Sequence, residues 1–86
     1  MTDTDSAAVT VRFFAGAARA MGTRSTQVEV DGPSTLAEVV EALDARGDAA
    51  RVLGLCSWLV DARRATPDDV VAPGAVVDAL PPFAGG

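Results

Sequence analysis

The sequence has 86 residues, of which 49% are hydrophobic, and its 7 basic and 12 acidic residues give a net charge of -5. A chain of this length can build one hydrophobic core and is too short for two domains. The lack of lysine, histidine and tyrosine excludes Schiff-base, Ser-His-Asp, Cys-His and imidazole-metal chemistry, and the negative charge favours a basic protein surface over nucleic acid as partner.

The sequence also carries no signal for a membrane or an oxidising compartment. No apolar run approaches the roughly 20 residues of a membrane helix, and the acidic opening MTDTDSAA lacks the basic and hydrophobic regions of a signal peptide. We therefore expect a cytoplasmic protein without a membrane segment, in which residues 1–8 form a disordered lead. Cys56 is the only cysteine, so we expect no internal disulfide and no metal site, and interpret Cys56 as a buried structural thiol.

The first third of the chain predicts two strands with a short helical turn between them. Apolar residues alternate over 8–15, which is typical of a strand with one buried face, and Phe14 falls on its outer face. Residues 16–25 are rich in glycine and alanine and predict one turn of helix, whereas 26–30 alternate again and predict a second strand. The residues expected to face inward on the first strand are Val9, Val11 and Phe13.

The clearest local signal is an amphipathic helix over 36–46. Thr35 and Glu38 have the spacing of a capping box, and Gly47 supplies a left-handed stop. Apolar residues recur at the helical spacing i, i+3, i+4 and i+7. They are Leu36, Val39, Val40 and Leu43.

The remaining segments predict two further strands. Residues 49–55 indicate a loop or irregular helix, 57–61 a short strand, and 62–69 turns. Residues 76–80 alternate again, with Val77 and Ala79 on one face and Leu80 sharing the other face with Asp78.

This order of elements describes an α+β domain in which one main helix packs across a mixed sheet. The β-grasp (ubiquitin-like) arrangement fits it, and from the elements alone a ferredoxin-like split or another small α+β roll fits as well. We assign 9–80 to the domain and 81–86 to an extended tail that ends in Gly-Gly.

The sequence LPPFAGG at the end of the chain has the composition of a reactive arm. Gly85 and Gly86 lack a Cβ and can enter a narrow channel, whereas Pro81 and Pro82 stiffen the base of the tail. The six residues after Leu80 reach about 20 Å at roughly 3.3–3.6 Å each. The terminal carboxylate, with a pKa of about 3.3–3.7, is ionised and can attack the α-phosphate of ATP, and the resulting acyl-adenylate can accept sulfur.

Together VTVRFFAGAARAMGT, STLAEVVEAL and LPPFAGG resemble the small sulfur-carrier subunits of molybdopterin synthase, the MoaD/ThiS-like group. The resemblance implies a ubiquitin-like fold, adenylation and thiocarboxylation of the tail by an E1-like enzyme that uses ATP, and sulfur transfer to the pterin precursor. It also implies a heterotetramer with the large synthase subunit, no activity of the chain alone, and no bound cofactor.

The resemblance assigns the reacting position to Gly86, next to Gly85, and a hydrophobic docking patch to Phe14 and Leu80. We expect Phe83 to be a docking anchor, in a partner-binding tail that also includes Pro81, Pro82 and Ala84. The sequence departs from the family pattern at Arg64, where an apolar residue is common. It also departs at VDAR, where Val-Asn-Gly is usual, and at APGA, where Asp-Gly-Asp is usual.

Three alternatives to molybdopterin synthesis remain from the sequence. The same sulfur chemistry could serve thiamine or cysteine synthesis, because a fold does not determine a substrate. The chain could instead be a ubiquitin-like modifier whose glycine carboxyl forms an amide with other proteins. The third alternative is a passive binding module whose tail is never activated.

Overall fold

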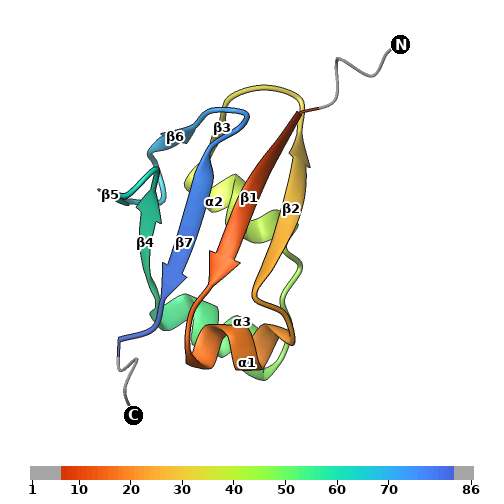
Figure 1. Ribbon diagram of the computed structural model, residues 1–86, viewed down its shortest axis with the longest axis vertical. Helices are drawn as coiled ribbons and strands as arrows, with labels where there is room; N and C mark the ends of the chain where they lie inside the picture. Colours follow the sequence, from red (N-terminus) through yellow and green to blue (C-terminus); the bar gives the residue numbers. More distant parts are fainter. Residues whose placement is uncertain (1–6, 83–86) are drawn as a thin grey trace.

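The computed structural model describes residues 7–82, and these form an α+β domain (Figure 1). In chain order the elements are β1 (Ala7–Phe13), α1 (Gly16–Met21), β2 (Ser25–Val30), β3 (Ser34–Thr35), α2 (Leu36–Ala42), α3 (Asp48–Leu55), β4 (Ser57–Val60), β5 (Arg63–Ala65), β6 (Val70–Val71) and β7 (Val76–Leu80).

Five strands form one mixed sheet in the order β2-β1-β7-β4-β5, and β3 pairs with β6 in a separate two-stranded ladder. The first and last strands lie side by side at the centre and run parallel, with Val11 opposite Val77 and Arg12 opposite Asp78. The other pairings in the larger sheet are antiparallel. In Figure 1, α2 crosses behind the sheet and α1 and α3 lie at its lower end, and no helix crosses the face of the sheet toward the viewer.

The core lies between the sheet and the helices, and alternation along the strands selects its members, as predicted. On the central strands the inward residues are almost fully buried, and Leu36 and Val39 of α2 meet them from the helical side. The other two helices contribute one buried core residue each, Ala17 from α1 and Leu53 from α3. The buried strand residues are Val9, Val11, Phe13, Val28, Val77 and Ala79.

The predicted start of the main helix is confirmed, but its predicted end is wrong. The Thr35 side chain accepts a hydrogen bond from the Glu38 N–H, and Glu38 accepts one from the Thr35 N–H, which completes the capping box. The helix then ends at Ala42 rather than at 46, because Asp44 adopts a φ of 53°, a conformation that aspartate tolerates better than most residues. Gly47 precedes α3 as its N-terminal cap and does not stop α2.

Two further expectations need correction. Residues 48–55 form a regular helix, α3, rather than a loop or irregular helix. The segment predicted as turns contains β5, which pairs with β4 through a two-residue connection of Asp61 and Ala62, with φ values of 49° and 69°. Positive φ at both positions matches the twist of a hairpin, and Asn-Gly is its usual signal. Without a glycine in this turn, the sequence did not indicate the hairpin.

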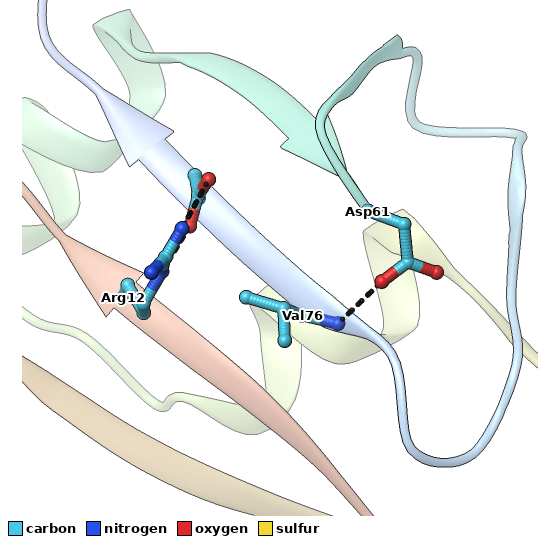
Figure 2. Close-up of polar contacts among 4 residues, drawn as sticks. Arg12, Asp61 and Val76 are labelled. Atoms are coloured by element: carbon cyan, nitrogen blue, oxygen red, sulfur yellow. Dashed lines mark hydrogen bonds and ion pairs between the residues drawn. The ribbon is translucent and has the colours of Figure 1, made fainter.

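Backbone and side-chain bonds hold this glycine-free turn in place. The Val76 N–H donates to Asp61 Oδ1 at 2.9 Å (Figure 2). In addition, the Asp61 N–H donates to the Val76 carbonyl at 2.8 Å. These contacts fasten the hairpin to the start of β7 and offset the cost of positive φ at a residue with a Cβ. With both sheets assembled, the arrangement is the expected β-grasp fold.

Replacing Leu36 with alanine tests the packing of α2 on the sheet. Leu36 is 1% exposed, and removing a fully buried leucine costs about 2–5 kcal/mol. We expect the free energy of unfolding in urea to fall by this amount, whereas Leu55→Ala on α3, where the side chain is 58% exposed, should cost much less. Equal losses at the two positions would contradict the packing described here.

Candidate functional site

The face of the sheet away from the helices carries the residues that the sequence singled out for docking. Alternation directs Arg12 of β1, Asp78 and Leu80 of β7, and Leu59 of β4 to this face, because their chain neighbours are packed in the core. Arg12, Asp78 and Leu59 are opposite one another in the register across three strands. We call this surface the outer face.

An ion pair lies at the centre of the outer face (Figure 2). Arg12 Nε donates to Asp78 Oδ1 at 2.7 Å and Arg12 Nη2 donates to Asp78 Oδ2 at 3.0 Å, which is a bidentate contact. The Asp78 side chain is 9% exposed, whereas that of Arg12 is 51% exposed. Hydrogen bonding to Asp78, together with its negative charge, raises the pKa of Arg12 above its ordinary value. The guanidinium therefore stays charged while it covers the carboxylate.

Phe14 follows directly after β1 and lies exposed beside this pair. Its ring is 39% exposed, and the guanidinium carbon of Arg12 lies 5.6 Å from the ring centroid, within cation-π range. The Phe14 N–H donates to the Ala79 carbonyl at 3.3 Å, and the Phe14 carbonyl accepts from the Ala17 N–H at 2.9 Å. The backbone therefore fixes Phe14 between the end of β7 and the start of α1.

Leu80 ends β7 opposite Ser57 of β4 and is half-buried. Because Phe14 is bonded to Ala79, the structure brings the two predicted patch residues, Phe14 and Leu80, to the same end of the outer face. Pro81 is half-buried and Pro82 is exposed. The other predicted tail residues lie outside the described range 7–82, and they are Phe83, Ala84, Gly85 and Gly86.

The sequence did not single out the Arg12–Asp78 pair. Alternation directs both residues to the solvent side of their strands, but 66 positions separate them in the chain. Only the parallel pairing of β1 with β7 brings them into contact. The signal that could have found the pair is the β-grasp topology itself, in which these two strands are neighbours.

A cleft lies on the other side of the sheet, between α2, α3 and the β4–β5 hairpin. This cleft has a volume of about 760 Å³, and Val40, Leu53 and Trp58 are among the residues that line it. Cys56, which is half-buried, lies in its wall and donates from Sγ to the Val52 carbonyl at 3.4 Å. Cys56 is thus half-buried rather than buried as predicted, and burial raises the pKa of its thiol, which disfavours the thiolate form.

Within residues 7–82, no three histidine, cysteine or acidic side chains gather in a group that could hold a metal ion. In the same part of the chain, no helix has the length and apolar character needed to cross a membrane. The structure places Phe14 and Leu80 on the outer face, as the alternation of residues predicted, at the end of β7 that leads into the tail.

Comparison with known proteins agrees with this geometry. The model of the ThiS family matches residues 11–86. Small archaeal modifier protein 1 from Haloferax volcanii is similar in structure at a TM-score of 0.76 and 27% identity, covering 88% of this chain and 98% of that chain. No match was found among curated proteins.

Two more distant structures show the same fold. A candidate molybdopterin converting factor, subunit 1, from Pyrococcus furiosus has a TM-score of 0.74 and 21% identity, covering 88% of this chain and 98% of that chain. Urm1 from Trypanosoma brucei has a TM-score of 0.72 and 20% identity, covering 98% and 100%. At these lower identities the likeness supports the fold alone.

Removing one member of the ion pair should lower the thermal stability more than removing both. In Arg12→Leu the Asp78 carboxylate keeps its burial but loses its partner, and such a charge is costly. We expect Arg12→Leu to lower the Tm by several degrees, and the double variant Arg12→Leu/Asp78→Ala to recover most of the loss. Differential scanning calorimetry measures both. A double variant less stable than Arg12→Leu would show that the Asp78 side chain stabilises the fold without its partner.

Proposed function

The chain belongs to the ThiS family of ubiquitin-like sulfur carriers, and we propose that it delivers its sulfur to the pterin precursor of molybdopterin. The observation that carries the proposal is that the family match extends through the Gly-Gly end at 86, directly beyond a strand at the centre of the sheet. Members of this family work with E1-like activating enzymes. In the proposal, such an enzyme and the large synthase subunit are the two partners.

The chemistry begins at the carboxylate of Gly86. One of its oxygens attacks the α-phosphorus of ATP in the activating enzyme and releases pyrophosphate, and the resulting acyl-adenylate makes the carbonyl carbon electrophilic. Sulfide-level sulfur (HS⁻) from the sulfur donor then attacks this carbon, the bond to the AMP oxygen breaks, and loss of the proton leaves a thiocarboxylate. The thiocarboxylate sulfur is a stronger nucleophile than a carboxylate oxygen. The chain supplies the arm and the partner supplies the catalytic groups, so we expect no activity of the chain alone.

The geometry of the domain supports delivery by an extended arm. β7 is held on both sides, by β1 and by β4, so the base of the tail is anchored as far as Leu80. The six residues beyond it reach about 20 Å, which is long enough to enter the active site of a partner seated against the outer face. Within this proposal Phe14, Leu80 and Pro81 form the docking patch, and Phe83 is a docking anchor in the tail, next to Pro82 and Ala84. Gly85 and Gly86 enter the narrow channel of the partner, where Gly86 reacts.

The similarity to the archaeal modifier favours a second candidate function. As a protein modifier, the chain would form the same acyl-adenylate. An amine of another protein would then attack its carbonyl carbon, displace AMP and form an amide. It has no lysine, so chains of itself linked through lysine side chains cannot form. Genomic proximity to a pterin-binding large subunit would favour the sulfur proposal, and proximity to a thiazole synthase would favour thiamine synthesis.

Intact-protein mass spectrometry tests the activation of the tail. After incubation with ATP, a sulfur donor and the cognate E1-like enzyme, we expect a mass gain equal to the replacement of one oxygen by one sulfur. A chain lacking Gly86 should not change, whereas a chain lacking residues 2–6 at the opposite end should react like the wild type. An unchanged wild-type mass, with an enzyme that activates another carrier, would refute the sulfur-carrier step.

Phe14→Ala tests the docking patch. Exposed aromatic residues that a partner buries contribute much of the binding energy at interfaces, so we expect the Kd for the cognate large synthase subunit to rise about tenfold or more. Val70 on β6 is 66% exposed and lies outside the outer face, so Val70→Ala should change the Kd less than about twofold. Isothermal titration calorimetry measures both, and equal effects would exclude Phe14 as a specific contact.

A further inference from the structure

The outer face is an open sheet surface that combines exposed apolar side chains with arginines. Phe14 is exposed, and Leu59 and Leu80 are half-buried although no helix covers them. Arg12 contacts the Phe14 ring on one side, and on the other side Asp78 separates it from Leu59 in the register. The charges on this surface determine which partner surface it can accept.

The Arg12–Asp78 pair exposes its cation and hides its anion. The guanidinium has five N–H donors, of which two bind Asp78, so its outward edge keeps donors for another acceptor. The carboxylate is 9% exposed and lies beneath this edge. An approaching protein therefore meets a positive group with free donors, held in one orientation by the bidentate contact.

Arg64 supplies a second cation to the same surface. It is exposed on the edge strand β5 and lies opposite Leu59 in the register, and its neighbour Ala65 packs toward the core. Arg64 also lines the cleft between α2, α3 and the β4–β5 hairpin, so it lies at the edge of the outer face. Within residues 7–82, no carboxylate lies within ion-pair distance of Arg64. Three strand spacings separate the backbones of Arg12 and Arg64, which is about 14 Å. The apolar Leu59 lies between them.

We propose that the outer face docks on an acidic surface of the E1-like activating enzyme, where carboxylates flank an apolar area and pair with Arg12 and Arg64. The inference rests on the proposed function, because it takes the activating enzyme as partner. The net charge of -5 favours a basic partner at long range, but the Debye length is about 8 Å at physiological salt. Contact is therefore governed by the charges on the face itself.

Several of the acidic residues that give the chain its net charge lie away from the end of the outer face that leads into the tail, and Asp61 lies in the β4–β5 turn beside the start of β7. Glu38 and Glu41 lie on α2, behind the sheet, and Asp44 and Asp48 follow in the helical layer. On the outer face Glu29 of β2 is opposite Ala8, close to the other end of β1 from Phe14. The end of the face that leads into the tail is thus locally positive and apolar.

Charge reversal with matched controls tests the proposal. Arg64→Glu, which breaks no ion pair of the described residues, should raise the Kd for the cognate activating enzyme roughly tenfold at about 0.05 M NaCl. The effect should shrink at about 0.5 M NaCl because the charges are screened. Arg46→Glu and Arg51→Glu change the net charge equally in the helical layer, where these arginines pair with Asp44 and Asp48, and should change the Kd less than about twofold.

The double variant Arg12→Leu/Asp78→Ala tests the other cation without leaving a buried carboxylate unpaired. We expect it to raise the Kd severalfold at low salt, with a circular dichroism spectrum like that of the wild type. Equal effects from all three charge reversals would reduce the role of the arginines to net charge and overturn the proposal. So would wild-type binding by both Arg64→Glu and the double variant.

The outcomes separate this inference from the proposed function. If the wild type, Arg64→Glu and the double variant bind the enzyme equally and all three are thiocarboxylated, the acidic docking surface is refuted and the sulfur carrier stands. If the wild type binds but acquires no sulfur from an active enzyme, the proposed function is refuted. The dependence of the Kd on Arg64 and on salt then still decides whether the face recognises an acidic surface.

Discussion

The parallel pairing of β1 with β7 is the constraint on which the rest of the structure depends. It joins the first strand to the last at the centre of the sheet and gives the core its most deeply buried residues, among them Val11 and Val77. On the opposite face the same register places Arg12 beside Asp78. The hydrogen bond from the Phe14 N–H to the Ala79 carbonyl extends the pairing of the two strands to Phe14. The core, the ion pair and the proposed docking patch are therefore consequences of one alignment between two strands.

The ion pair at the centre of the outer face combines a stability cost with a specific geometry. Removing charges from water is expensive, and replacing such pairs with apolar residues is often neutral or stabilising. A half-covered pair keeps solvent on its cationic side, and its bidentate contact fixes the guanidinium plane above Phe14. The pair thus contributes orientation and charge beside the apolar residues Phe14, Leu59 and Leu80 of the outer face.

Much of the fold could be predicted because short-range patterns decide it. Alternation identified the inward residues of β1 and β7, and the Thr35–Glu38 capping box located the start of α2. The helix end, the β4–β5 hairpin and the ion pair could not be predicted in this way. An aspartate ends α2 where the glycine at 47 gave the stronger signal, and alanine stands at a turn position that usually carries glycine. Arg12 and Asp78 meet only through the tertiary pairing of distant strands. Of the candidate site, the outward direction of Phe14 and Leu80 was predictable, whereas its charge pattern was not.

The central position of β7 also bears on how the molecule is made. Contacts between residues 66 positions apart close a large loop, and non-local pairing of this kind slows folding. Until residues 76–80 have been synthesised, the sheet lacks its middle strand, and β1 and β4 have no partner between them. A chain cut short during translation would therefore lack the sheet centre together with the glycines. Under the proposed function, only a finished domain presents the tail, so incomplete chains would not compete for the activating enzyme.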